Sequence, residues 1–358
     1  MQIATTQRAI VVEKTGGPEV LEYRTDYPVP KPKSGHILVR NTISSINFID
    51  TYFRTGLYPS PKPEVLGREA VGTVAALGPE TDKYDLKIGD RVIWLANGGY
   101  AEFSSVPAEK TIKIPAGLRD EDVLASFMSG LTALALTQET YTVKPGDWVF
   151  LHAAAGGVGI LMAQILKGLG ATVIGTAGGP DKVELVKALG VDHVIDYRSD
   201  QGTHWTQDVL ELTKGAGVDV VYDSVGKDTW KGSLEVVKRK GTVVWFGNSS
   251  GPIPPLPLQQ LSPKCVKIAR PTLFGYITTR EEFEYYSGQI FDLLQAGKLK
   301  VNIHGIYDLE EAQKAHKVVL LSPFSNLFPF LFLTDKALTL RIQDLESRNT
   351  RGKLLLRI

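Results

Sequence analysis

The 358-residue sequence contains only one cysteine, Cys265, and almost no excess of charge. A single cysteine excludes an intramolecular disulfide and a cysteine-rich zinc site, and it is compatible with a reducing compartment. The net charge of +1, from 40 basic and 39 acidic residues, gives no electrostatic footprint for nucleic acid or for an anionic membrane. We therefore expect small or neutral partners, and nucleic acid is not expected among them.

The chain also lacks the marks of export and of membrane insertion. Its start, "MQIATTQRAIVV", has no charged region followed by an apolar one, and its end, "LLLRI", is not a C-terminal targeting signal that we recognise. The most apolar part, within residues 318–343, contains Pro323 and Pro329 and is shorter than the ~20 apolar residues that a membrane span needs. We expect a cytoplasmic protein with no membrane segment.

Length and pattern predict two domains, because 358 residues exceed what one core usually serves. From about residue 147 onward, apolar runs such as "WVFLHA", "ATVIGTA" and "GTVVWFG" alternate with helical patterns such as "PDKVELVKALG". Repeated strand–helix–strand units predict a doubly wound parallel sheet. The first 130 residues instead contain short runs such as "HILVRNTISSIN" and "GDRVIWLA" between Gly, Pro and Asp turns, which predicts an antiparallel or barrel-like β unit.

The stretch "LHAAAGGVGI" is a glycine-rich turn between a predicted strand and a predicted helix. In the G-x-G-x-x-G frame of dinucleotide sites, Ala154 takes the first position, Gly156 the second and Gly159 the third. Gly156 would let the backbone approach a pyrophosphate, which would lie on the helix N-terminus at Gly157 and Val158. Gly159 would allow the helix to pack closely against the strand. Alanine can serve at the first position if its φ stays negative. A turn that merely packs is the alternative.

The end of the next strand distinguishes NAD from NADP. NAD sites usually offer a carboxylate there for the ribose hydroxyls, but this strand ends "GTAGGPDK", with Thr176 where an acid would stand. Asp181 comes late and is followed by Lys182, which can neutralise the extra phosphate of NADP. Tyr197, after the following strand, can hydrogen-bond that phosphate. The sequence favours NADPH, while a solvated lysine and a packed tyrosine stay open as alternatives.

Several segments together point to a known family: "GGPEVL", "SSINFIDTYFRTGLYP", "LHAAAGGVG", "VVYDSVGKDTW", "WFGNSSG", "ARPTLFGYITTREE" and "ESRNTRG". In this order they resemble the quinone oxidoreductase (zeta-crystallin) branch of the zinc-free medium-chain dehydrogenase/reductases, over nearly the whole chain. The resemblance implies an α/β protein with a GroES-like, partly open β-barrel catalytic domain at 1–133 and 305–358. It also implies a Rossmann domain at 134–304, NADPH as cofactor and a homodimer.

The resemblance implies site residues as well. Asn47 and Thr132 would flank the nicotinamide and, with the pocket tyrosines Tyr52 and Tyr58, form the catalytic group; ordinary polar loop residues are the alternative, and Tyr52 could belong to the core. The cofactor-binding set comprises Asn47, Thr132, Gly156, Gly157, Val158, Thr176, Lys182, Tyr197, Ser224, Phe246, Gly247, Asn248, Ser249 and Arg348.

The zinc-dependent relatives of this branch place a metal-binding cysteine near Asn47 and a Gly-His-Glu motif at Gly67-Arg68-Glu69. Arginine cannot ligate zinc as histidine does, and the six histidines show no ligand spacing, so we expect no metal site. Quinones and conjugated enones need less help than alcohols, because their added electron density is delocalised. Hydrogen bonds from Asn47, Tyr52, Tyr58 or water are expected to stabilise the developing anion.

The resemblance implies quinone as the substrate class, so the expected function is NADPH-dependent reduction of quinones without metal or flavin. One alternative is an NADPH-dependent reductase of alkenal or enone double bonds. The other is an NADPH-binding protein with an RNA-binding or structural role, although the neutral charge argues against RNA.

Residues 318–343 form an apolar insertion that departs from the family pattern. It could be a lid or partner surface, because exposed apolar patches usually mark interaction sites. It could also be a retained intron translated in frame, because its removal gives "KAHKDLESRNTRG", which is close to the family pattern. We favour this interpretation. In either case Arg348 follows the insertion closely and its reach to the cofactor is at risk.

Overall fold

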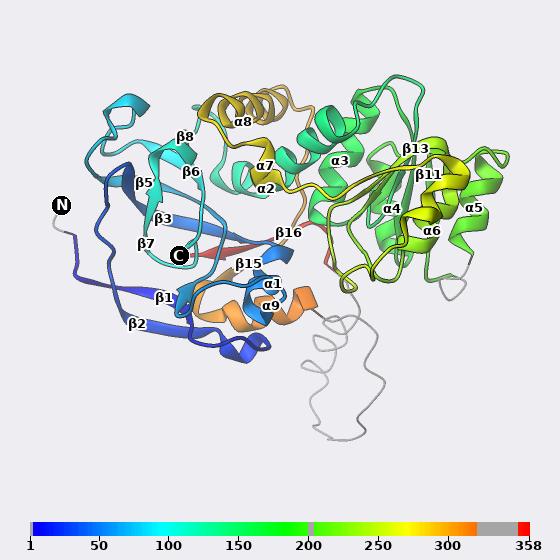
Figure 1. Cartoon of the computed structure of the whole chain (residues 1–358). Coiled ribbons are helices and arrows are strands. Elements are labelled where there is room, and N and C mark those ends of the chain that lie inside the picture. Colours follow the sequence, from blue (N-terminus) through cyan, green and yellow to red (C-terminus); the bar gives the residue numbers. More distant parts are fainter. Residues whose placement is uncertain (1–2, 200–203, 321–349) are drawn as a thin grey trace, which may run out of the picture. The chain divides into compact units, whose positions relative to one another are not determined.

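The computed structural model describes residues 3–199, 204–320 and 350–358. They form two compact units, Met1–Met128 with Ile303–Ile358, and Ser129–Asn302 (Figure 1). The sequence placed the boundaries at 133/134 and 304/305. In the structure the first boundary falls inside helix α2 (Asp120–Ala135), so that this helix contributes to both units.

The first unit is built from two sheets with mainly antiparallel pairing. A seven-stranded sheet has the order β15-β16-β3-β5-β6-β8, with β7 paired to β3, and a three-stranded sheet has the order β2-β1-β4. The C-terminal strand β16 pairs antiparallel with β3, so both ends of the chain build this unit. The strands are β1 (Thr6–Val12), β2 (Glu22–Pro28), β3 (His36–Ile46), β4 (Glu64–Val65), β5 (Glu69–Leu77), β6 (Arg91–Leu95), β7 (Phe103–Pro107), β8 (Thr111–Lys113), β15 (Ile303–Asp308) and β16 (Lys353–Arg357).

Several strands of this unit, among them β3, β5, β6 and β16, contain runs of consecutive buried residues, so side chains from both of their faces are buried. Ile37, Val92 and Trp94 belong to one buried cluster. Ile10 and Leu354 belong to another, which the helices α1 (Phe48–Thr55) and α9 (Ala312–Leu320) flank. Burial of such apolar surface is the main favourable term in folding. The C-terminal strand is therefore part of the core and not an appendage.

The second unit is a six-stranded, all-parallel sheet in the order β11-β10-β9-β12-β13-β14. Helix α4 packs on β10 and β11, and α6 packs on β12 and β13. The elements are β9 (Trp148–Leu151), α3 (Gly157–Gly168), β10 (Thr172–Ala177), α4 (Pro180–Ala188), β11 (His193–Asp196), α5 (Trp205–Leu212), β12 (Val218–Asp223), α6 (Trp230–Val236), β13 (Val237–Trp245), β14 (Lys267–Ala269), α7 (Leu273–Tyr276) and α8 (Arg280–Gln295).

This strand order confirms the predicted doubly wound sheet, and it fixes where a ligand can bind. The chain winds outward from β9 through β10 to β11, and then returns to the other side of β9 with β12. Ligands of such sheets bind beyond the carboxyl ends of the strands at this switch point. The glycine-rich turn follows β9 directly and Ser224 follows β12 directly, so both lie at that position.

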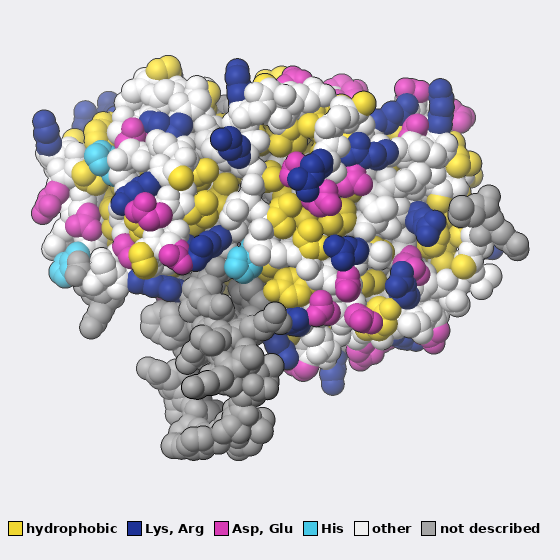
Figure 2. Space-filling view, turned by 180° about the vertical axis from the view of Figure 1, so that it is seen from behind, with side chains coloured by type: hydrophobic (Ala, Val, Ile, Leu, Met, Phe, Trp, Pro, Cys, Tyr) yellow, Lys and Arg dark blue, Asp and Glu magenta, His cyan; other side chains and the backbone are white. Residues whose placement is uncertain are grey.

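Two observations concern membrane spans and the distribution of surface charge. Among the described residues, every helix is too short or too polar to cross a membrane. Figure 2 shows basic and acidic side chains interspersed over the face in view, without a large patch of one charge sign.

The insertion at 318–343 lies mostly outside the described residues. Only its first residues, up to Leu320, are described, and they form the end of α9.

Candidate functional site

The glycine-rich turn has the geometry of a dinucleotide site. A Cβ on Gly159 would lie 2.3 Å from the carbonyl oxygen of Ala153, so this position needs glycine, and the close approach is between α3 and the turn that follows β9. Ala154 keeps a negative φ, and the left-handed φ of +52° falls on Ala153 instead. The first hydrogen bond of α3 runs from Ile160 N to the oxygen of Gly156, so the N–H groups of the preceding helical residues point out of the helix end.

Thr176 supports this turn from the neighbouring strand. Its side-chain oxygen accepts a hydrogen bond from Ala153 N at 3.1 Å, and its carbonyl oxygen accepts one from Ala154 N at 2.9 Å. Thr176 is buried. The structure thus assigns Thr176 a place behind the turn, where it holds the backbone in position.

The end of β10 leads to a second polar region. Gly178 lies close to the side chain of Tyr197. A Cβ on Gly178 would lie 2.6 Å from the tyrosine hydroxyl oxygen. The same Cβ would lie 3.0 Å from Nε of Arg198, so this arginine also contacts the turn. Lys182 lies in the first turn of α4, immediately after it. Sequence reasoning missed Arg198, although its position beside Tyr197 was a usable signal.

The loops after β12 and β13 are joined by backbone hydrogen bonds. Ser249 N donates to Ser224 O at 3.2 Å, and a Cβ on Gly247 would lie 2.5 Å from that same oxygen. Asp223, at the end of β12, accepts from Val225 N at 2.8 Å and so shapes the first loop. The structure therefore brings together the predicted adenosine-side residues, which are Ser224, Phe246, Gly247, Asn248 and Ser249.

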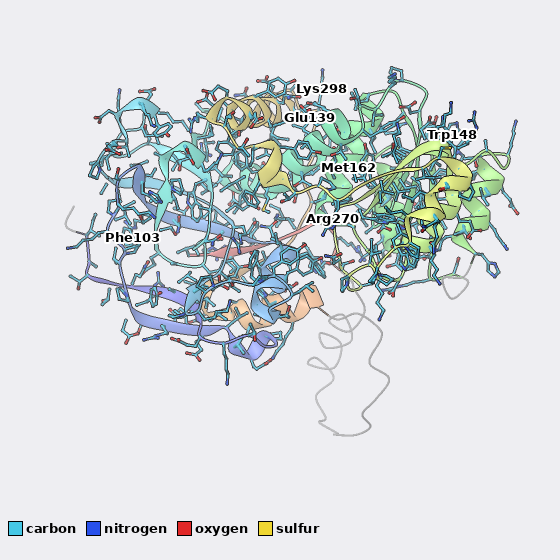
Figure 3. All side chains as sticks on the ribbon, in the orientation of Figure 1. Phe103, Glu139, Trp148, Met162, Arg270 and Lys298 are labelled. Carbon is cyan, nitrogen blue, oxygen red and sulfur yellow. The ribbon has the colours of Figure 1, made fainter. Side chains whose placement is uncertain are left out.

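Arg270 contacts this group, and it too was missed from the sequence. When the Asn248 amide is oriented so that its nitrogen donates to Gly247 O, its oxygen accepts from Arg270 Nη2 at 3.1 Å. Figure 3 labels Arg270, which follows β14. Of the remaining predicted residues, Thr132 lies on α2 in the second unit, and Arg348 lies outside the described residues.

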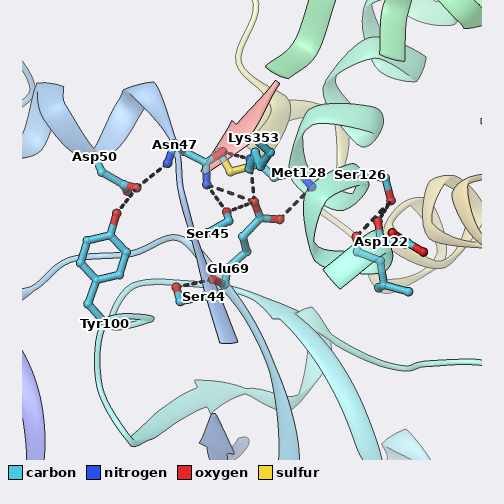
Figure 4. A network of polar contacts seen from close by, with 11 residues as sticks. Ser44, Ser45, Asn47, Asp50, Glu69, Tyr100, Asp122, Ser126, Met128 and Lys353 are labelled. Carbon is cyan, nitrogen blue, oxygen red and sulfur yellow. Dashed lines mark hydrogen bonds and ion pairs between the residues drawn. The ribbon is translucent and has the colours of Figure 1, made fainter. Parts of the chain in front are cut away.

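The first unit contains a buried polar network around Asn47 (Figure 4). The side-chain nitrogen of Asn47 donates to Ser45 Oγ and to Glu69 Oε1, both at 3.0 Å. Its side-chain oxygen accepts from the ammonium of Lys353. Since both amide hydrogens are used inside this network, the expectation that Asn47 donates to a developing substrate anion loses support.

Glu69 is the centre of this network. Its Oε1 accepts from Ser45, Asn47 and Lys353, and its Oε2 accepts from Met128 N at 2.9 Å. Four donors on a fully buried carboxylate satisfy both oxygens. Sequence reasoning missed Lys353, because one lysine at the start of an apolar strand carries no motif.

Tyr52 and Tyr58 belong to an aromatic cluster on and after α1. Their ring centroids lie 5.0 Å apart, and Phe53 contacts Tyr58 at 5.7 Å. Tyr52 is 9% exposed and Tyr58 is half-buried. The two tyrosines are therefore neighbours, and Tyr58 is the more accessible of the pair.

Arg68 stands where the resemblance places the histidine of the zinc-dependent relatives. Its guanidinium lies 3.6 Å over the ring of Phe53 and donates to Asn97. A guanidinium has no lone pair for a metal, and the nearby Asn47 oxygen is bonded to an ammonium. These donors do not fit zinc. Within the described ranges, His, Cys, Asp and Glu form no group of three or more that could hold a metal ion.

A second buried cluster joins Asp50 and Arg54 of α1 to His316 of α9. The Tyr100 hydroxyl donates to Asp50 Oδ2 at 2.8 Å and lies 3.1 Å from His316 Nε2, while Arg54 lies 3.3 Å from His316 Nδ1. Burial raises the pKa of Asp50 to about 6. Burial, together with the positive charge of Arg54, lowers the pKa of His316 to about 3. The imidazole is thus neutral at physiological pH.

Known proteins match both units of the chain. Residues 33–116 match the family described as "Alcohol dehydrogenase GroES-like domain", and residues 157–291 match "Zinc-binding dehydrogenase". A probable quinone oxidoreductase of Schizosaccharomyces pombe is 39% identical over 348 residues, which are 97% of this chain and 96% of that protein. The chain belongs to the quinone oxidoreductase family. This is the zinc-free branch of the medium-chain dehydrogenase/reductases that the sequence resembles.

Two further relatives of the quinone oxidoreductase family are informative. The crystal structure of Escherichia coli quinone oxidoreductase complexed with NADPH matches with a TM-score of 0.86 and 39% identity, over 98% of this chain and 100% of that one. A 2-haloacrylate reductase of a Burkholderia species is 39% identical over 320 residues, which are 86% of this chain and 94% of that protein. The fold is the GroES-like β domain plus Rossmann domain of this superfamily.

Proposed function

We propose that this chain catalyses the NADPH-dependent reduction of quinones, without metal or flavin. The observation that carries the proposal is the second unit's glycine turn at the switch point, followed by a strand that ends without a carboxylate. The relatives support the substrate class and the cofactor, since they include quinone oxidoreductases and one is complexed with NADPH.

The described residues fit NADPH. The helix end at Gly156, Gly157 and Val158 would hold the pyrophosphate, because its N–H groups and its dipole favour an anion. Lys182 and Tyr197 would surround the 2′-phosphate, and Arg198 joins them in this proposal because it contacts the same turn. Ser224, Phe246, Gly247, Asn248 and Ser249 would line the adenosine side, while Asn47 and Thr132 would flank the nicotinamide. When bound, NADPH supplies a hydride.

The chain's own part in the reaction is to orient the acceptor and to stabilise negative charge. Tyr58 and Tyr52 are the proposed donors to the oxygen on which charge develops. We expect no dedicated general base or nucleophile, because quinone reduction needs close placement of donor and acceptor more than proton abstraction. Arg68 and the bonded Asn47 offer no ligand set for a metal that would assist.

Reduction of activated carbon–carbon double bonds is the second candidate. The 2-haloacrylate reductase is as similar in identity as the first quinone oxidoreductase described above. The two reactions share a hydride acceptor whose negative charge is delocalised onto oxygen. The same tyrosines would serve either substrate.

NADPH oxidation with a panel of quinones, enones and 2-haloacrylate tests both candidates. We expect the highest kcat/KM with quinones; a clear preference for 2-haloacrylate or an enone would favour the second candidate. Tight NADPH binding with no turnover of any acceptor would contradict the enzyme proposal. In that case an RNA-binding or structural role would be examined, with a gel-shift assay as its test.

We further propose a cytoplasmic homodimer. Within the described part of the chain, β14 is an edge strand of the parallel sheet, and its Ile268 is 38% exposed. An exposed edge can pair with the same strand of a second copy across a two-fold axis. Light scattering after gel filtration would give the mass, and replacement of Ile268 by proline should reduce it to that of one chain.

A further inference from the structure

Lys353, Glu69 and Asn47 come from three neighbouring strands of the first unit. Lys353 begins β16, Asn47 follows the end of β3, and Glu69 begins β5, and these strands are adjacent in the order β16-β3-β5. The register places Leu354 opposite Ile46, so Lys353 and Asn47 lie at the same end of the sheet. Figure 4 shows their side chains converging on one point.

The network determines which way the Asn47 amide faces. An ammonium can only donate hydrogen bonds, so the atom beside Lys353 Nζ must be the amide oxygen. The Glu69 carboxylate accepts from Asn47, so the atom beside Glu69 Oε1 must be the amide nitrogen. Reversal of the amide would place donor against donor and acceptor against acceptor. The orientation of Asn47 is therefore fixed by charge.

We propose that Lys353 is a positioning residue, which fixes Asn47 so that its amide oxygen, and not its nitrogen, is presented as an acceptor to the nicotinamide end of the cofactor. The proposal rests on the proposed function, in which Asn47 flanks the nicotinamide. An amide oxygen has two lone pairs, and Lys353 uses one of them. The second suits an N–H donor such as a carboxamide group.

The alternative is that Lys353 only compensates the buried charge of Glu69. The side chains are 5% and 0% exposed, and their charged atoms lie 3.0 Å apart. Removal of one partner of such a pair leaves an uncompensated buried charge and is destabilising. A loss of activity in one variant would therefore not separate positioning from stability, and a second variant is needed.

Glu69→Gln combined with Lys353→Met supplies that second variant. Met128 N donates to Glu69 Oε2 in the wild type, so we expect the side-chain oxygen of the introduced glutamine to turn toward Met128 N. The amide nitrogen of that glutamine would then face Asn47 and donate to its oxygen, which turns the Asn47 amide over. The double variant buries no charge but holds Asn47 in the wrong orientation. The effect on stability can therefore be measured separately from the effect on the orientation of Asn47.

The experiment compares wild type, Lys353→Met and the double variant by thermal unfolding, steady-state kinetics and calorimetric titration. The titrations use NADPH and adenosine 2′,5′-bisphosphate, which carries the 2′-phosphate but no nicotinamide. Lys167→Met is the control, because Lys167 also pairs with an acid, Asp192, but at the far end of α3 from the glycine turn.

We expect Lys353→Met to lower Tm, to weaken NADPH binding roughly 5- to 10-fold and to lower kcat on the order of 100-fold. The affinity for adenosine 2′,5′-bisphosphate should not change in either variant. The double variant should regain most of the lost Tm without regaining kcat or NADPH affinity. If Lys353→Met does not fold, the double variant carries the test, because it buries no charge.

Two results would overturn the positioning role alone: a double variant that regains NADPH affinity and kcat together with Tm, or a Lys353→Met protein with unchanged kcat and NADPH affinity. A wild-type chain that binds NADPH no more tightly than adenosine 2′,5′-bisphosphate, and reduces no quinone, would instead overturn the proposed function and this role with it.

Discussion

The α-carbon of Gly159 faces the carbonyl oxygen of Ala153 so closely that a Cβ would lie 2.3 Å from that oxygen and 2.8 Å from backbone atoms of Ala154. Backbone atoms cannot swing aside as a flexible side chain can. The third glycine of the dinucleotide frame is therefore fixed by packing between the turn and α3.

Gly159→Ala should consequently displace α3 from the turn. We expect a loss of about 1–3 kcal/mol in the free energy of unfolding, the usual effect of overpacking, and weaker NADPH binding. Urea unfolding and NADPH titration measure the two effects. Gly168→Ala, at the end of the same helix, is the control, since a Cβ there meets nothing within 4 Å. Equal effects of both substitutions would contradict the packing argument.

Lys182→Ala tests the assignment of NADPH over NADH. Loss of a hydrogen bond to a charged group costs about 1.5–3 kcal/mol, so NADPH affinity should fall on the order of 10- to 100-fold while NADH affinity stays the same. Lys187→Ala on the same helix is the matched control, because Lys187 pairs with Glu184 at the surface, near the end of α4. If Lys182→Ala weakens NADPH and NADH equally, the phosphate assignment is wrong.

Arg198→Ala extends this test to a residue that the sequence did not single out. Arg198 contacts the Gly178 turn beside Tyr197. If it shares the 2′-phosphate with Lys182, the double substitution should abolish the preference for NADPH, and each single one should reduce it. An unchanged ratio of kcat/KM for NADPH and NADH in Arg198→Ala would remove it from the site.

The sequence predicted the second unit better than the first for a physical reason. A parallel strand buried on both faces is a continuous apolar run, and the turn that follows β9 must be glycine-rich for steric reasons. Both features are local. The parallel sheet and the close approach at Gly159 were therefore predictable, whereas the strand order came from the structure.

The residues that escaped prediction act through distant neighbours. Lys353 meets Glu69 across 284 positions of the sequence, and Arg270 meets Asn248 only after β13 and β14 pair in space. For Asn47 the family resemblance pointed to the right region, but not to the direction of its amide, which depends on Lys353 and Glu69. Hydrogen-bond direction follows from tertiary partners and has no sequence pattern.

His316 should make the unfolding free energy fall at acid pH. Arg54 and Tyr100 face its ring, and Asp50 lies beyond Tyr100. Its folded pKa of about 3 lies below the usual 6.5, so its contribution is complete above pH 6.5 and is lost as the pH falls toward 3. Between pH 6.5 and pH 4.5 the expected loss is ~2–3 kcal/mol.

Asp50 opposes this trend. Its folded pKa of about 6 lies above the usual 3.8, so its contribution is complete below pH 3.8 and is lost as the pH rises through 6. His316→Gln should therefore flatten or invert the acid slope of the unfolding free energy. Urea unfolding at several pH values measures it, with the half-buried His36→Gln as control. An unchanged acid slope in His316→Gln would contradict the prediction.

Tyr58→Phe removes the hydroxyl of this residue and keeps its ring, so it tests the hydroxyl alone. The ring contacts with Tyr52 and Phe53, at 5.0 and 5.7 Å, survive the substitution, so the unfolding free energy should change little. If the hydroxyl donates to the developing anion, kcat/KM for a quinone should fall on the order of 100-fold, while NADPH affinity stays the same.

Tyr52→Phe should have a smaller effect on kcat/KM, because Tyr52 is only 9% exposed and is the less accessible of the pair. Tyr27→Phe, on β2 of the same unit, is the control for loss of a tyrosine hydroxyl. Steady-state kinetics with saturating NADPH distinguishes the three variants. A Tyr58→Phe enzyme with full kcat/KM, together with a strongly impaired Tyr52→Phe enzyme, would exchange the roles of the two tyrosines. Full activity of both would move the charge-stabilising donor away from this aromatic cluster.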